Sequence, residues 1–86
     1  MESHFDLFSL KNKTIVLTGS AGRLGSRFAH ILSEAGADVV LVDILKSENK
    51  KLERELIEKY NTNPTAFSID ISKQDEMKHL VKKVIS

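Results

Sequence analysis

The chain has 86 residues, of which 41% are hydrophobic and 29% charged, and its formal net charge is +1 at pH 7. A chain this short makes at most one small domain, and its near-neutral charge gives no reason to expect nucleic acid or an anionic membrane as a partner. The absence of cysteine excludes a disulfide, a thiolate nucleophile and a cysteine-based zinc site, and no apolar run approaches the roughly 20 residues of a membrane span. We expect a cytoplasmic protein.

The chain opens with residues 1–12, which we expect to form an N-terminal arm that packs an aromatic side chain or two against a sheet. The folded part is predicted over residues 13–86. Its first strand covers 13–18, where three apolar residues follow one another at 15–17. Consecutive apolar residues are typical of a parallel strand that is buried on both faces.

An amphipathic helix is predicted next, from Leu24 to Ala35, because its apolar residues recur at the spacing of one helical face that packs on the sheet. The residues of this face are Leu24, Phe28, Ile31, Leu32 and Ala35. Gly36 follows at a position suited to a left-handed helix cap, so the helix should end there. The second strand is predicted over 38–43, a run of branched apolar residues that ends at Asp43.

The second half of the chain continues this alternation. A helix over 46–60 carries apolar residues on one side and charge on the rest, and the charged side is interpreted as a solvated face. A turn at 61–64 precedes a third strand over 65–71, and an S-x-x-D capping box at 72–75 predicts a last helix. The order β-α-β-α-β-α indicates an α/β fold, namely the first half of a Rossmann-type, doubly wound parallel sheet.

The turn between the first strand and the first helix carries Gly19, Gly22 and Gly25. Gly19 lies where the chain must turn sharply, which favours a positive φ. Gly22 lets the backbone approach a pyrophosphate, and Gly25 lets the helix pack closely against the strand. The unpaired N–H groups of the first helical turn favour a diphosphate. A P-loop is excluded, since no Gly-Lys-Ser/Thr follows the glycines.

Asp43 indicates the kind of dinucleotide. An acid about 20 residues after the glycines is placed to accept hydrogen bonds from the hydroxyls of an adenosine ribose. The same carboxylate would repel the 2′-phosphate of NADP, which needs basic residues nearby. Arg23 is a basic residue of the loop that could reach such a phosphate; the alternative is that it lies along the pyrophosphate or in solvent. The sequence therefore predicts NAD as the cofactor, with NADP less favoured.

Together these residues resemble the short-chain dehydrogenases/reductases. The resemblance runs from LKNKTIVLTG at Leu10 to the Asp70-Ile71-Ser72 segment, and its most specific part is the glycine fingerprint, usually written TGxxxGxG in that family. Here the turn reads TGSAGRLG over 18–25, so the outer glycines match and the middle one is shifted by one position. The form TGxxGxxG is similar to that of the extended, nucleotide-sugar branch of the family.

The resemblance implies roles for residues beyond the glycines. It implies that Asp70 hydrogen-bonds the adenine amino group, that Ile71 offers a backbone contact and that Ile44 flanks the ring. The expected cofactor-binding residues are Gly19, Ala21, Gly22, Arg23, Leu24, Gly25, Asp43, Ile44, Asp70 and Ile71. The family further implies an NAD(P)-dependent oxidoreductase that moves a hydride between nicotinamide and an alcohol, ketone or sugar carbon, with a small-molecule substrate and a homo-oligomeric state.

No catalytic residue and no metal site are expected within these residues. The family's catalytic tyrosine is followed four residues later by a lysine, whereas Pro64 stands four residues after Tyr60, the single tyrosine. We therefore expect the N-terminal third of a longer enzyme. Two alternatives stay open: an extended-type nucleotide-sugar epimerase or dehydratase, suggested by the glycine spacing, and a non-catalytic dinucleotide-binding module. Because the first strand is central in a complete doubly wound sheet, residues 15–17 should form an exposed apolar edge here, an aggregation hazard.

Overall fold

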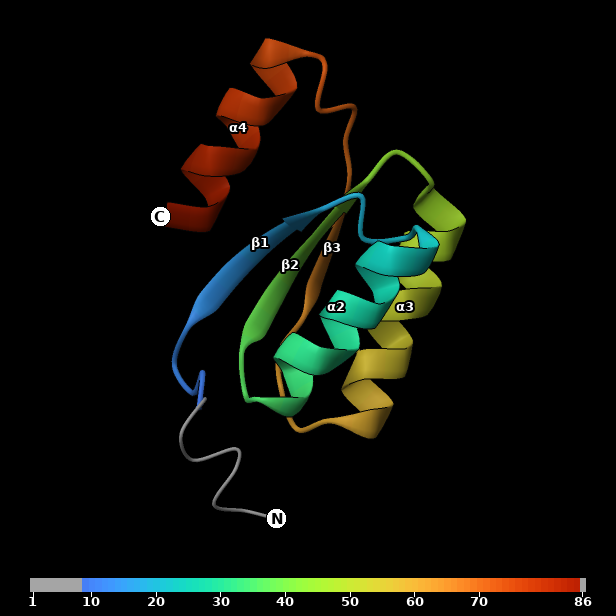
Figure 1. The fold of residues 1–86 in the computed structure, drawn as a ribbon. Helices are drawn as coiled ribbons and strands as arrows, with labels where there is room; N and C mark the ends of the chain where they lie inside the picture. The colour runs from blue at the N-terminus through green and yellow to red at the C-terminus, as the bar shows by residue number, and fades with distance from the viewer. Residues whose placement is uncertain (1–8, 86) are drawn as a thin grey trace.

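The computed structural model describes residues 9–85 of the chain, and most of the predicted arm over 1–12 lies outside them. Six elements follow in the predicted order (Figure 1). They are β1 (Thr14–Thr18), α2 (Arg23–Glu34), β2 (Asp38–Asp43), α3 (Lys46–Lys59), β3 (Thr65–Ser68) and α4 (Gln74–Ile85). The α/β alternation predicted from the sequence is therefore confirmed.

The three strands form one parallel sheet in the order β1-β2-β3, with β2 in the middle. Thr18 at the end of β1 pairs with Val42, and Asp43 at the end of β2 pairs with Ser68 at the end of β3. This register brings the carboxyl ends of all three strands to one edge of the sheet. In open parallel sheets, ligands bind at this edge.

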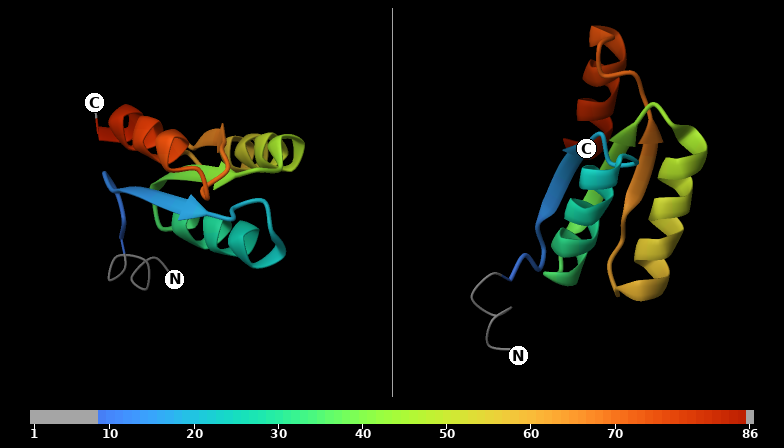
Figure 2. Two further views of the ribbon diagram at one scale, coloured as in Figure 1. Left: turned by 90° about the horizontal axis from the view of Figure 1, so that it is seen from above. Right: turned by 45° about the vertical axis from the view of Figure 1, so that its right-hand side comes forward.

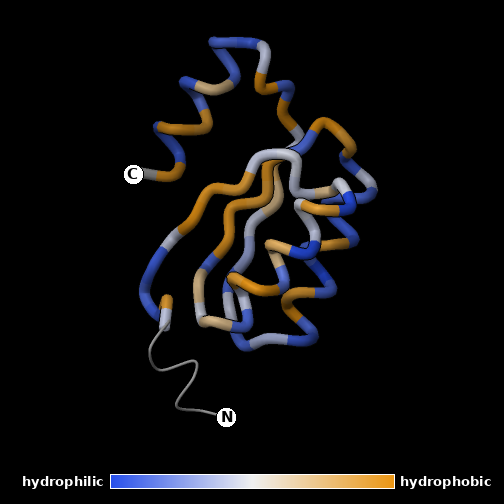
Figure 3. The backbone as a smooth tube through the Cα atoms, in the orientation of Figure 1, coloured by the Kyte–Doolittle hydropathy of each residue, from blue (hydrophilic) through white to orange (hydrophobic). Residues whose placement is uncertain are grey.

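The side chains of β2 alternate between two apolar layers. Val39 and Leu41 are fully buried on the face that α2 and α3 cover side by side, and Leu56 of α3 packs against them. Val40 and Val42 point to the opposite face, where they meet Leu80 of α4. Figure 2 shows α2 and α4 on opposite sides of the sheet, and Figure 3 shows the apolar stretches along β1 and β2.

β1 is the edge strand of this sheet. It pairs with β2 on one side, and among residues 9–85 no strand pairs with its other side. Val16 is 45% exposed, and Ile15 and Leu17 are only half-buried. The apolar edge predicted from the sequence is therefore present. The burial of this strand on both faces is not, because the described chain leaves the α4 side of Val16 open.

β3 is shorter than the predicted strand over 65–71. It ends at Ser68 because its pairing partner β2 ends at Asp43. The next residue, Ile69, still donates its N–H to the Asp43 carbonyl at 3.2 Å, after which the chain turns away from the sheet. Asp70 therefore lies in a loop beyond the strand, at the same edge as Asp43.

The buried face of α2 differs from the predicted one. Leu24, Phe28 and Ile31 are 66%, 47% and 62% exposed, whereas Ala29 and Ser33 are the buried residues of the helix. Of the large residues of the predicted face, Leu32 packs against the core, so the prediction was wrong for Leu24, Phe28 and Ile31. Small side chains face the strands and allow a close approach of the helix. Hydrophobic periodicity identifies a helical face but does not tell which neighbour covers it.

The end of α2 follows the prediction. Gly36 has φ +104°, and its N–H donates to the carbonyl of Ser33 at 3.0 Å. The N–H of Ala37 donates to the carbonyl of Leu32 at 3.1 Å. These two bonds make a Schellman cap, in which a left-handed glycine ends the helix and starts the next strand.

Candidate cofactor-binding site

The glycine turn leads from β1 into α2 with little room for side chains. Gly19 has φ +69°, in the left-handed region, and its N–H donates to the carbonyl of Val42 at 2.8 Å. A Cβ added to Gly25 would lie 2.1 Å from the carbonyl oxygen of Gly19, far inside contact distance. The sharp turn and the close approach predicted at these two glycines are therefore both present.

The first turn of α2 offers unpaired backbone donors. Gly22 is the N-cap residue, with an extended backbone and no side chain that caps the helix. The N–H groups of the residues that follow it have no partner within the helix. No acidic residue lies in this first turn, and Arg23 is exposed there. This helix end therefore has the electrostatic character that favours a bound anion.

The Asp43 carboxylate faces the glycine turn. Its Oδ2 accepts the N–H of Ala21 at 2.9 Å, and its Oδ1 accepts the N–H of Leu45 at 2.9 Å. Each carboxylate oxygen can accept a further hydrogen bond, so the group can still receive two ligand hydroxyls. The two backbone bonds fix the side chain in one orientation, between the turn and the start of α3.

A cavity of about 180 Å³ opens at the carboxyl ends of the strands. The residues that line it are Gly19, Val42, Asp43, Ile44, Ile69, Asp70 and Ile71. The structure thus brings together five of the ten expected residues, and adds Val42 and Ile69, which the sequence prediction did not include. Ile44 and Ile71 are 64% and 52% exposed, so two apolar side chains stand open to solvent beside the two carboxylates.

The other five expected residues are Ala21, Gly22, Arg23, Leu24 and Gly25, and they form the glycine turn and the first turn of α2. They lie outside the cavity lining. The turn and the cavity share Gly19, and they are connected by the hydrogen bond from Ala21 to Asp43. The expected residues therefore make one continuous surface along the sheet edge.

Asp70 is held by its own loop. Its Oδ1 accepts the hydroxyl of Ser72 at 2.6 Å and the N–H of Ser72 at 3.0 Å. These bonds, the side-chain one first, lower the pKa of Asp70; burial opposes them, and the nearby charge of Lys73, the smallest of these effects, lowers the pKa further. The predicted capping box at 72–75 is replaced by this turn, because the Ser72 hydroxyl is directed to Asp70 and α4 begins only at Gln74.

Ser20 and Asn49 were missed by the sequence prediction. Both are buried, with 0% and 1% of their surface exposed, and the Ser20 hydroxyl donates to the Asn49 side-chain oxygen. Asn49 lies four residues after Leu45 and three before Leu52, on the apolar side of α3. A polar residue at such a position was the one signal available in the sequence.

Tyr60 packs against the core beside His30. It follows the last residue of α3, packs on the core, and its hydroxyl lies 3.0 Å from Nδ1 of His30. Burial, and secondarily the charge of Glu34, raise the pKa of Tyr60, so this phenol holds its proton at neutral pH. Within residues 9–85, no group of three or more histidine, aspartate or glutamate side chains is arranged to hold a metal ion.

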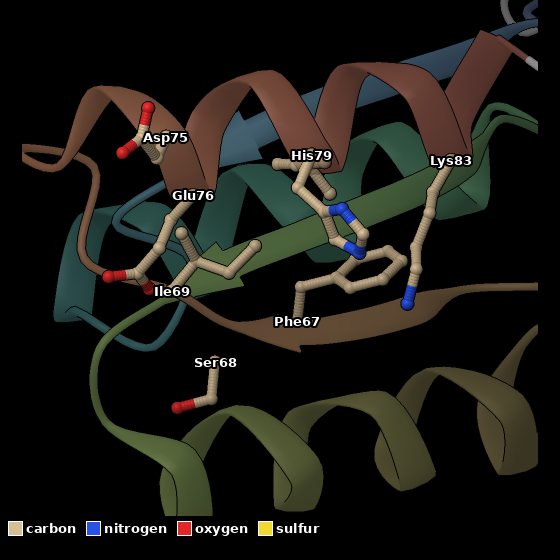
Figure 4. Close-up of a pocket in the computed structure, with 8 residues that line it drawn as sticks. Phe67, Ser68, Ile69, Asp75, Glu76, His79 and Lys83 are labelled. Atoms are coloured by element: carbon tan, nitrogen blue, oxygen red, sulfur yellow. The ribbon is translucent and has the colours of Figure 1, made fainter.

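A second cavity, of about 460 Å³, lies between β3 and α4 (Figure 4). Phe67 projects from the strand toward His79 and Lys83 of the helix, and Ile69, just beyond the strand, lies near Glu76, while Ser68 points to the other side. No residue of the glycine turn lines this cavity.

Among the helices of the described residues, none has the length and apolar character to cross a membrane.

A parallel β-α-β-α-β sheet with a glycine turn after its first strand and an acid at the end of its second defines a dinucleotide-binding domain of Rossmann type. The sequence model of the short chain dehydrogenase family matches residues 13–86. The chain belongs to this family.

Similar proteins agree with this assignment. The chain is 33% identical over 79 residues to a sorbose reductase from Candida albicans, an alignment that covers 92% of this chain and 28% of the relative. It is 37% identical over 75 residues to an (S)-acetoin-forming diacetyl reductase from Staphylococcus epidermidis, with 87% and 29% covered. The crystal structure of L-sorbose reductase from Gluconobacter frateurii, complexed with NADPH and L-sorbose, superposes with a TM-score of 0.83 at 25% identity, covering 88% of this chain and 29% of that one. The chain thus spans less than a third of the length of these relatives.

Proposed function

We propose that this chain is the cofactor-binding part of an NAD-dependent oxidoreductase that acts on a small alcohol, ketone or sugar. The observation that carries the proposal is the position of Asp43, whose carboxylate lies beside the glycine turn and lines the cavity at the sheet edge. An acid at the end of the second strand receives the ribose hydroxyls of the cofactor in this class of domain.

Each part of the site matches a part of the dinucleotide. The apolar side chains of Ile44 and Ile71 would flank the adenine, and the Asp70 carboxylate would accept a hydrogen bond from the adenine amino group. Asp43 would accept hydrogen bonds from the ribose hydroxyls, and the N–H groups at the start of α2 would bind the diphosphate. The nicotinamide supplies the hydride chemistry when the cofactor is bound.

NAD is favoured over NADP by the charge at the ribose position. A 2′-phosphate would stand next to the Asp43 carboxylate, which would repel it. Arg23 is exposed at the start of α2 and is the basic group that would oppose this repulsion. The Gluconobacter frateurii L-sorbose reductase was crystallised with NADPH, and this comparison weighs against NAD.

The substrate class is argued from the relatives. Those of highest similarity reported above are reductases of sorbose and diacetyl, which favours carbonyl reduction of a small sugar or ketone over nucleotide-sugar epimerisation. A non-catalytic module is disfavoured for the same reason. On this proposal, a tyrosine–lysine pair encoded beyond residue 86 performs the acid–base chemistry, since Tyr60 packs against the core, has a raised pKa and is followed four residues later by Pro64.

The proposal is tested by calorimetric titration of the full-length protein with NAD and with NADP. We expect NAD to bind at least about tenfold more tightly, and Asp43→Ser to weaken NAD binding by about tenfold while improving NADP binding relative to NAD. Asp38→Ser is the matched control. Its carboxylate also accepts a backbone N–H, from Asn63 at 2.9 Å, but at the opposite end of β2. Tighter binding of NADP than of NAD by the unaltered protein would contradict the role given to Asp43.

A further inference from the structure

Asn49 is a fully buried polar residue on a helix whose other buried residues are Leu52 and Leu56. Its side chain is bonded at both ends. Nδ2 donates to the carbonyl of Leu41 at 3.0 Å and to the carbonyl of Phe67 at 3.2 Å, and Oδ1 accepts the hydroxyl of Ser20. Asn49 is thus anchored on two neighbouring strands and presents its oxygen to the glycine turn.

Ser20 is the part of the turn that Asn49 holds. Ser20 follows Gly19 and precedes Ala21, and its side chain is completely buried. The glycines of this turn have no side chains that could hold the backbone in place. The two flanking residues are held by β2, since Gly19 donates to the Val42 carbonyl and Ala21 to the Asp43 carboxylate. The N–H of Ser20 also donates to the Val42 carbonyl, at 3.3 Å. The Ser20 hydroxyl adds the one side-chain attachment among these, to α3.

An apolar side chain at position 49 would bring no polar atoms of its own to pair, but it would leave the carbonyls of Leu41 and Phe67 and the hydroxyl of Ser20 without the amide as a partner. A buried amide is costly unless its donors and acceptor are all paired. The donors and the acceptor of the Asn49 amide are all paired, and the one partner that lies outside the sheet belongs to the glycine turn. The amide is therefore explained by what it holds rather than by packing alone.

We infer that Asn49 is a positioning residue of the cofactor site. Through the Ser20 hydroxyl it holds the glycine turn in the shape that directs the N–H groups at the start of α2 toward the diphosphate of the dinucleotide. This inference rests on the proposed function and adds to it a residue remote from the cavity lining. It requires that loss of the Ser20–Asn49 bond weakens the binding of the diphosphate and leaves the binding of the adenosine unchanged.

The test compares ligands that do and do not carry the diphosphate. In the full-length protein, Ser20→Ala should weaken binding of NAD and ADP by about five- to tenfold, as expected for losing the preorganisation that one hydrogen bond supplies. Asn49→Leu removes this bond and also the two bonds to the carbonyls of Leu41 and Phe67, so it should weaken binding at least as much. Adenosine affinity, measured by NMR titration, should stay within about twofold. The double variant should bind no more weakly than Asn49→Leu alone, because both changes remove the same bond.

Ser33→Ala is the matched control, since Ser33 is also buried and its hydroxyl has no hydrogen-bond partner in the structure. It should leave every affinity unchanged. Equal losses for adenosine and ADP would overturn the inference in favour of a general loss of folding, as would unchanged affinity in Ser20→Ala, the milder variant. Failure of the unaltered protein to bind NAD would instead overturn the proposed function, and the inference with it.

Discussion

Asp70 shows how one residue can be set for binding by its immediate neighbour. Both donors of Ser72, the hydroxyl and the N–H, are bonded to a single carboxylate oxygen, and they lower the pKa of Asp70 below its ordinary value of 3.8. The other oxygen has no part in these two bonds. The loop therefore keeps the carboxylate charged and leaves one of its oxygens to a ligand at the cavity.

This arrangement predicts a change in titration. Ser72→Ala removes the hydroxyl bond, which is the largest cause of the shift, so the pKa of Asp70 should rise toward its ordinary value in carbon-13 NMR titrations of the carboxyl group. Because the folded-state pKa is depressed, ionised Asp70 favours the folded chain above about pH 4, and this contribution is lost as the pH falls through the folded pKa.

Ser47, an exposed serine of α3, provides the control. Ser47→Ala should leave the titration of Asp70 unchanged. An Asp70 curve that is the same in Ser72→Ala as in the unaltered protein would show that the hydroxyl bond does not set the charge of this residue.

Single residues of the site were predictable where backbone geometry demands a residue type. Gly19 and Gly25 are such positions, and Asp43 is found at the end of a strand that the sequence already delimits. The Ser20–Asn49 bond was not predictable, because it joins residues 29 positions apart. A serine in a loop and an asparagine in a charged segment look ordinary until the fold brings them together.

At the scale of elements, α2 and α3 are held in different ways. The larger apolar residues of α2 are substantially exposed, whereas Leu52 and Leu56 of α3 are buried in the core. The free energy of folding should therefore depend on the leucines of α3 and much less on the aromatic residue of α2.

Urea denaturation of two variants tests this difference. Leu56→Ala, at a site with 0% exposure, should reduce the free energy of unfolding by about 2–5 kcal/mol. Phe28→Gln, at a site with 47% exposure, should change it by no more than about 0.5 kcal/mol. A comparable loss in both variants would mean that the apolar face of α2 is packed, as hydrophobic periodicity alone suggests.

The elements themselves were largely predictable, because each begins and ends at a local signal. The glycine cap at Gly36 ends α2, and the acid at Asp43 ends β2. β3 was predicted too long, since Ile69 and Ile71 continue the alternation although β2 offers no further partner. Strand length is set by the neighbouring strand, which the local sequence does not contain.

At the scale of the whole molecule, the sheet has an open side at β1. The backbone groups of β1 that face away from β2 have no strand partner within the described residues, and Val16 adds an exposed apolar side chain. Unpaired strand edges of this kind pair with other chains.

The 86-residue polypeptide should therefore self-associate as its concentration rises, which sedimentation velocity can measure. Val16→Lys should shift the distribution toward the monomer, because a charge on an edge strand opposes pairing. Val81→Lys adds the same charge at a similarly exposed site on α4 and should have little effect. An unaltered chain that stays monomeric at all concentrations would contradict the prediction that chains associate through the edge of β1.

The parallel register described above also places the candidate cofactor site and a set of structural contacts at opposite ends of the strands. One rim of the sheet carries Gly19, Asp43 and Asp70, while at the other rim Asp38 receives the backbone of Asn63 and Gly36 closes a helix. The contacts described at the second rim lie within the fold and away from the cavity. Cofactor preference and thermal tolerance should therefore be separable traits in this scaffold, so that directed evolution could retune the one rim while reinforcing the other, with few substitutions in conflict.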